Sequence, residues 1–118
     1  MQKHSILTLT VIAAGVIAAE RFVTAAGAYP TAAGPALGVS TTSAAAAGDA
    51  FPVDVLGTTV VTAGEAFAKG DAIAVGTSGK AVYGYDDGYI VGHALQASTG
   101  DGDRVEILLI PTALPGAR

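Results

Sequence analysis

Residues 6–19, ILTLTVIAAGVIAA, carry no charged side chain, and the interpretation of this stretch decides the fold. Lys3 and His4 precede it and small residues follow it, an arrangement that would also suit a cleaved secretory signal. As a signal it is poor, because its basic region holds one lysine and threonine occurs twice in the apolar run. We therefore expect Ser5–Ile12 to be the first strand of the fold, in a chain without a signal peptide.

The same stretch recurs in the middle of the chain, where no signal could lie. Residues 7–15, LTLTVIAAG, align with residues 56–64, LGTTVVTAG, at a spacing of 49 positions, and five of the nine residues are identical. Residues 34–56 align with residues 88–110 at a spacing of 54, with coincident turn glycines, Gly-Asp pairs and apolar strand positions. Chance similarity in an Ala/Gly-rich chain is the alternative. Agreement of turns and strand phase in the same order favours an internal duplication.

A duplicated unit of this size cannot bury its apolar face alone. We therefore expect a single all-β domain over residues 1–118, a small β-sandwich or closed β-barrel of two similar half-units. The pseudo-repeats run roughly over residues 5–56 and 57–110. Residues 1–5 and 111–118 remain outside them as flexible arms, for which simple terminal fraying is the alternative.

Composition agrees with thin β layers and indicates a partner. The chain is 51% hydrophobic, mostly through alanine and valine, and it holds 16 glycines but only 6% aromatic and 14% charged residues. Small side chains on a glycine-rich backbone suit closely packed sheets better than thick helical cores. So few charges leave a monomer short of polar covering, which predicts that another subunit covers part of the surface. The alternative is that alanine and glycine inflate the hydrophobic count.

Short apolar blocks punctuated by Gly, Pro and Asp predict strands rather than helices. The candidate strands are Ser5–Ile12, Arg21–Thr24, Ala36–Thr41, Ala50–Leu56, Thr58–Thr62, Asp71–Val75, Lys80–Tyr83, Tyr89–Leu95 and Arg104–Ile110. The Asp-Gly step in residues 85–89, YDDGY, predicts a tight hairpin. Helix is confined to one or two short turns, at Gly64–Lys69 and at Ser43–Ala47.

Charge and residue types exclude several classes of function. A net charge of −4 with only six scattered Lys and Arg residues argues against nucleic acid as a partner. There is no cysteine, and the two histidines have no ligand spacing, so we expect no disulfide, metal or cofactor. Outside the opening run, no stretch approaches the ~20 apolar residues of a membrane helix, and we expect no membrane partner.

No arrangement of residues indicates catalysis. The acidic run at residues 99–104, TGDGDR, lacks the twelve-residue spacing of a calcium loop, so Asp103 is expected to cap backbone N–H groups in a turn. Gly48-Asp49 is expected to be the same device. Asp86 and Asp87 would diverge in a hairpin rather than converge as an acid/base pair. His93 replaces a valine of the first repeat, which favours packing or an interface. We expect a protein that is not an enzyme.

Three segments together resemble a known family. They are LTLTVIAAGVIAAERFV (residues 7–23), TAGEAFAKGDAIAVGTSGKAV (residues 62–82) and GYIVGHALQASTGDGDRVEILLIP (residues 88–111). In these segments the chain resembles the capsid cement, or head decoration, proteins of tailed bacteriophages. The most specific part is the Gly-Glu-Ala-Phe-x-x-Gly-Asp turn that leads into a strand and a Gly-Lys hairpin.

This resemblance implies a structural protein of the virion. It implies a protein made in the host cytoplasm that binds, as a homotrimer, to the outer capsid surface where subunits of the major capsid protein meet. There it would stabilise the head against internal DNA pressure. The expected contact residues lie in the two arms: Gln2, Lys3, His4, Ser5 and Ile6, and at the other end Pro111, Leu114 and Pro115.

Two other functions compete with this one. A secreted or surface binding module for carbohydrate or protein could use Tyr83, Tyr85 and Tyr89 as a stacking platform, although the tyrosines could equally pack across their hairpin. Another virion component, such as a tail-tube or fibre subunit, would share the composition.

Overall fold

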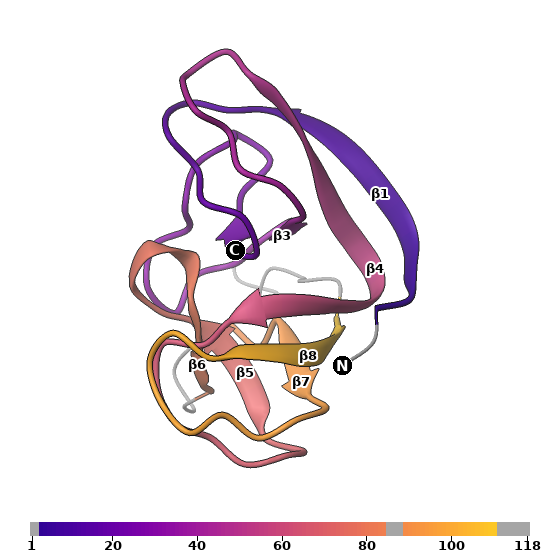
Figure 1. Cartoon of the computed structure of the whole chain (residues 1–118), viewed down its shortest axis with the longest axis vertical. Coiled ribbons are helices and arrows are strands. Elements are labelled where there is room, and N and C mark those ends of the chain that lie inside the picture. Colours follow the sequence, from indigo (N-terminus) through magenta and orange to yellow (C-terminus); the bar gives the residue numbers. More distant parts are fainter. Residues whose placement is uncertain (1–2, 85–88, 111–118) are drawn as a thin grey trace, which may run out of the picture.

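The computed structural model describes residues 3–84 and 89–110, and there the chain is all-β, as predicted (Figure 1). Its elements are β1 (Ser5–Ile12), β2 (Phe22–Val23), β3 (Gly38–Ser40), β4 (Ala50–Thr62), β5 (Ala72–Val75), the 3₁₀ turn η1 (Thr77–Gly79), β6 (Ala81–Tyr83), β7 (Gly92–Ala94) and β8 (Arg104–Leu109). Apart from β4, which joins two predicted strands, each strand lies in a segment that the alternation of apolar residues predicted.

The strands form one strongly curved sheet. Neighbouring strands follow the order β2-β3-β4-β8-β7-β5-β6, and β1 pairs with β4 beside this path. Every pairing between named strands is antiparallel. The sheet curls into a nearly closed barrel, which confirms the prediction of a small β-barrel (Figure 1). The predicted hairpin at residues 85–89 falls mostly on residues 85–88, outside the described part of the chain.

Strand β4 is longer than predicted because Gly57 does not end it. The expected strands Ala50–Leu56 and Thr58–Thr62 are one strand of 13 residues. Gly57 takes φ +96°, which glycine adopts without the steric cost of a side chain, so the strand bends and continues. The part before Gly57 pairs with β1 and β3, and the part after it pairs with β8.

The helical turns predicted at Ser43–Ala47 and Gly64–Lys69 are wrong. Neither segment is helical, and each instead contributes one residue to an isolated bridge: Ala44 pairs with Ile17, and Phe67 pairs with Ser98. A single helical turn fixes several dihedral angles for one hydrogen bond and is unfavourable alone. At both places, backbone hydrogen bonds to another segment are therefore favoured over a helical turn. The predicted Gly-Lys hairpin is present, with η1 joining β5 to the antiparallel β6.

Matching hydrogen bonds relate the two half-units. Ala13 N–H donates to the Asp49 carbonyl (2.8 Å), and Ala63 N–H donates to the Asp103 carbonyl (2.6 Å). The bridge Ile17–Ala44 is likewise matched by Phe67–Ser98. The second residues of the matched pairs (Asp49 with Asp103, Ala44 with Ser98) are 54 positions apart, as the sequence predicted. The first residues (Ala13 with Ala63, Ile17 with Phe67) are 50 positions apart rather than the predicted 49. The difference matters because a shift of one residue exchanges the two faces of a strand.

The core divides into two apolar clusters, and residues of the first half-unit contribute to both. The first-half cluster consists of Val11, Ala13, Ile17, Val23, Ala44, Phe51, Val53 and Val55. The other cluster combines Phe22 and Val39 from the first half with residues of the second half: Val61, Ala63, Phe67, Ile73, Val75, Ala81, Val91, Ala94, Val105, Ile107 and Leu109. Because Phe22 and Val39 are fully buried there, the first half-unit completes the core of the second.

Replacing Gly57 with alanine tests the close approach at the bend of β4. A Cβ there would lie 2.2 Å from the His4 carbonyl oxygen, whereas a Cβ at Gly48, which has nearly the same φ (+92°), meets nothing within 4 Å. We expect Gly48→Ala to lower the free energy of unfolding by about 1–2 kcal/mol through the left-handed backbone alone. Gly57→Ala should lower the free energy of unfolding by a further ~1–3 kcal/mol, because the added Cβ overpacks the bend. Urea unfolding of both variants measures the difference; equal losses would contradict the close approach.

Candidate functional site

The described residues contain no cluster of side chains that could hold a metal ion. Nowhere in residues 3–84 and 89–110 do three or more His, Asp or Glu side chains gather closely enough to hold a metal ion. His93 is exposed on β7, in keeping with the expected variation of packing or interface. In the same part of the chain, no helix is long and apolar enough to cross a membrane.

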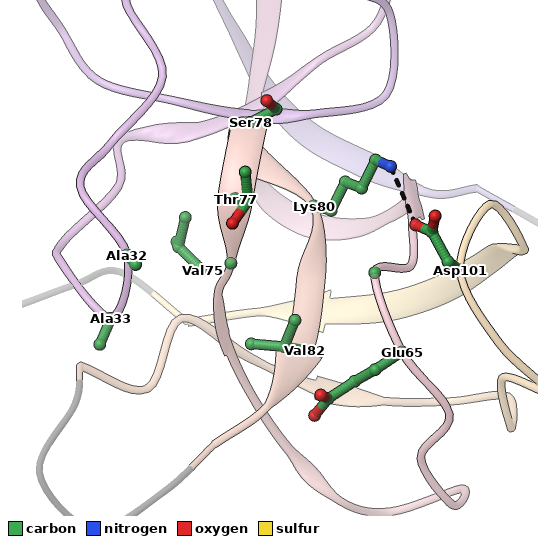
Figure 2. A pocket seen from close by; sticks show the side chains of 11 residues that line it. Ala32, Ala33, Glu65, Val75, Thr77, Ser78, Lys80, Val82 and Asp101 are labelled. Carbon is green, nitrogen blue, oxygen red and sulfur yellow. Dashed lines mark hydrogen bonds and ion pairs between the residues drawn. The ribbon is translucent and has the colours of Figure 1, made fainter.

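The hollow drawn in Figure 2 is an open groove of about 560 Å³ beside η1 and β6. Lys80 and Asp101 point toward each other at its rim, with 2.9 Å between Nζ and Oδ1. The Glu65 carboxylate accepts a hydrogen bond from the Tyr83 backbone N–H (3.0 Å). The charged groups of the groove therefore bind one another or the backbone, and none of its lining side chains is a histidine that could activate a hydroxyl.

The acidic residues after glycine have a structural role. In Gly48-Asp49, Gly70-Asp71 and Gly102-Asp103 the glycine takes φ between +92° and +93°. Each following carboxylate accepts a hydrogen bond from a backbone N–H three or four residues earlier, at 2.7–3.2 Å. The turn roles predicted for Asp49 and Asp103 are confirmed. Bonds from the Thr99 backbone and hydroxyl lower the pKa of Asp103, since they favour its charged form.

The expected N-terminal contact residues lie against the barrel. The Lys3 ammonium is 2.8 Å from Asp54 Oδ2. His4 and Thr58 form two hydrogen bonds: His4 N–H donates to the Thr58 hydroxyl (2.8 Å), and Thr58 N–H donates to the His4 carbonyl (3.1 Å). Ser5 begins β1. The contact role of this segment stays a prediction, and Gln2, Pro111, Leu114 and Pro115 lie outside the described residues.

Asp54 is a buried charge that the sequence analysis missed. Its side chain is 1% exposed, and its carboxylate accepts hydrogen bonds from the hydroxyls of Thr8 and Thr59, each at 2.8 Å, besides the contact with Lys3. Burial alone would raise the pKa of Asp54, but the bonds from Lys3, Thr59 and Thr8 outweigh it and hold the pKa below its usual value. The signal was present, since a lone aspartate between Val53 and Val55 must find partners when its strand is buried.

Exposed apolar side chains gather on β1 and the turn after it. The β1 surface, as we call it, consists of Ile6 (78% exposed), Leu7 (43%), Leu9 (40%), Ile12 (57%) and Val16 (71%). Figure 1 shows β1 along the outside of the molecule, with β4 beside it. A shallow groove of about 680 Å³ adjoins it, lined by residues 9–13 together with Ala25, Ala26 and Leu37. Within the described chain, the other large exposed apolar side chains are Tyr83 and Leu108. The β1 surface is therefore the candidate site for a macromolecular contact.

The tyrosine platform of the alternative function is only partly described. Tyr83 on β6 is 41% exposed, Tyr89 donates its backbone N–H to the Ala33 carbonyl (3.0 Å), and Tyr85 lies outside the described residues.

Comparisons with known proteins agree with the resemblance found in the sequence. The model of a family described as "Phage cement protein" matches residues 1–109, which confirms that resemblance. Among solved structures, the base of the head fiber protein gp8.5 of bacteriophage phi29 is similar in fold, with a TM-score of 0.74 and 21% sequence identity. The match covers 92% of this chain and 98% of the phi29 chain. A comparison with curated proteins gave no match.

Replacing Asp54 with asparagine should destabilise the barrel and remove one source of acid sensitivity. The pKa of Asp54 is lower in the folded protein than in the unfolded chain, so its stabilising contribution is complete above the unfolded pKa of about 3.9 and is lost as the pH falls through the lower folded pKa. At pH 7 we expect Asp54→Asn to cost about 1–3 kcal/mol, because partners of a buried carboxylate are left poorly satisfied.

The control for this variant is Asp101→Asn. The Asp101 side chain is 66% exposed in its ion pair with Lys80, so this substitution should cost no more than about 1 kcal/mol. Urea unfolding between pH 2 and pH 7 measures both variants against the wild type. A loss for Asp54→Asn that stays the same across that range would contradict the assigned ionisation.

Proposed function

The chain belongs to the phage cement protein family, and we propose that it binds the outer surface of the assembled phage head where subunits of the major capsid protein meet. Bound there, it stabilises the head against the pressure of the packaged DNA. The action is mechanical and needs neither catalysis nor a cofactor. We further propose that the protein is made in the host cytoplasm and acts as a homotrimer.

The observation that carries this proposal is the uneven distribution of apolar side chains on the barrel. Five large apolar side chains lie exposed on β1 and its following turn, while the hydroxyl and carboxylate groups near Asp54 are satisfied internally. Apolar surface of this kind is stabilised by removal from water, which a binding partner supplies. Many copies on one capsid lattice then add their individual contributions.

The N-terminal segment is the proposed contact with the capsid. Lys3 and His4 hold it against β4, and Ile6 follows with 78% of its side chain exposed. A fixed backbone with an exposed apolar side chain loses little conformational entropy on binding. We extend the same role to Gln2 and Ser5, and at the other end to Pro111, Leu114 and Pro115.

Binding of the purified protein to heads that lack it tests this function. We expect saturable binding and a higher temperature of DNA release from decorated heads. Ile6→Lys should weaken binding by about tenfold or more, because a lysine at a desolvated apolar contact costs more than 1.4 kcal/mol. Leu108→Lys on β8, where the native leucine is 41% exposed, is the control and should bind as the wild type does. A wild-type protein that neither binds heads nor delays DNA release would end the proposal.

A further inference from the structure

Corresponding strands of the two half-units differ in how well they are covered. At the spacing of 50 set by the hydrogen bonds, residues 58–62 of β4 correspond to residues 8–12 of β1. Thr59 is 1% exposed, but its counterpart Leu9 is 40% exposed and Ile12 is 57% exposed. At this position the covered strand carries a threonine and the uncovered strand a leucine, whereas the next pair, buried Val60 and exposed Thr10, shows the reverse. Apolar residues at the more exposed positions indicate that a partner covers β1.

The first half-unit covers the strand of the second. Thr58 N–H donates to the His4 carbonyl (3.1 Å), and Thr62 N–H donates to the Glu20 carbonyl (2.8 Å). Both bonds lie on the edge of β4 that faces away from β8. Segments before and after β1 therefore close that edge of β4, which keeps its backbone groups from water.

Among the described residues, no strand lies beside the same edge of β1. Ala13 N–H bonds to the Asp49 carbonyl, so the alternation of an antiparallel ladder turns the backbone groups of Thr8, Thr10 and Ile12 away from β4. Among the described strands, β1 pairs only with β4. An open edge next to exposed apolar side chains is a template for another chain.

We propose that a second copy of this chain closes the β1 edge, by repeating between copies the hydrogen bond that the Glu20 carbonyl accepts from Thr62 within one. The segment that it supplies is the turn at Gly70. Gly70 corresponds to Glu20, because Gly70 N–H bonds to the Ala94 carbonyl (2.8 Å) as Glu20 N–H bonds to the Ser40 carbonyl (2.7 Å), and both residues have positive φ. The Glu20 carbonyl accepts from Thr62, so Gly70 of the second copy accepts from the counterpart, Ile12.

The Gly70 turn can be reached by another chain. Residues 68–70 are exposed, and within the described residues no hydrogen bond ends on the Gly70 carbonyl. Each molecule thus has both a donor on β1 and an acceptor on this turn that are open to a partner. Because the two surfaces differ, the contact is head-to-tail, and a contact of this type forms a ring where the rotation between copies closes. The inference deepens the proposed homotrimer by naming its interface.

Charge explains why the occupant is a copy rather than a protein of opposite charge. Within the chain, an ion pair lies at the corresponding contact between the half-units: Arg104 Nε and Nη2 are each 2.6 Å from a Glu20 oxygen. At β1 the counterparts of these two residues are Ala50 and Gly70, which carry no charge. Two copies that each have a net charge of −4 can meet there without burying a charge.

Sedimentation and light scattering of the full chain without heads test the inference. We expect the wild type to self-associate at micromolar concentration, with a mass near three times 11.5 kDa. Ile12→Lys should weaken self-association by about tenfold or more, because it opposes Lys69 of the second copy beside Gly70. Lys69→Glu combined with Ile12→Lys should restore association by exchanging repulsion for attraction, and Leu108→Lys should leave it unchanged. Thermal unfolding by circular dichroism confirms that each variant folds.

Other outcomes separate this inference from the proposed function. A wild type that stays monomeric at all concentrations, or oligomers that Ile12→Lys leaves intact, overturn the β1 contact. Loss of association that the double variant does not restore overturns the Gly70 turn as the second surface. If the wild type is monomeric and Ile12→Lys weakens its binding to heads, then β1 contacts the capsid instead of a second copy. Oligomers that fail to bind heads leave the inference standing and remove the proposed function.

Discussion

Both half-units are built on the backbone hydrogen bonds of one continuous strand, β4. Before Gly57 this strand carries β1 on one edge and β3 on the other, and after Gly57 it carries β8. Each remaining strand reaches β4 through one of these neighbours. The strand can serve both halves because Gly57 bends it without a side chain, at a point where the His4 backbone approaches closely. Curvature, closure and the position of the N-terminal segment thus all depend on one residue that carries no side chain.

Alternation of apolar residues along short segments was enough to predict the strands, because a half-buried strand repeats every two residues. It could not predict that β4 is one strand, since the same glycine signals an end or a bend depending on what packs beside it. The helical turns failed for a related reason. Ser43–Ala47 resembles a capped turn locally, but Ala44 bonds to Ile17 across the sheet, a contact that local propensity does not include.

The candidate site was predictable in kind, and its place stays a prediction. Absence of catalytic motifs and shortage of charge indicated a contact protein, and the resemblance named its family. The predicted contact residues lie in the terminal arms, because extended termini can pair with the strands of a neighbouring chain. Ile6 of the N-terminal arm is exposed, and further exposed apolar side chains continue along β1 as far as Val16. Sequence alone could not show this, because Leu9 and Ile12 fit the pattern of a buried strand, and only the sheet order reveals that β4 is the one described strand that pairs with β1.

A chain made of two like units in tandem has an intrinsic asymmetry that accounts for this exposure. The second unit receives cover from the first through His4 and Glu20, whereas no strand of the described residues covers the corresponding edge of β1. Filling that position with polar residues would make β1 a stable outer edge, as natural sheets commonly do. The chain instead carries Leu9 at the position where the covered strand carries Thr59, and it has no charged side chain from Ser5 to Ala19. An edge left open by the architecture and kept apolar by the sequence is the expected state of a subunit whose neighbours arrive on assembly.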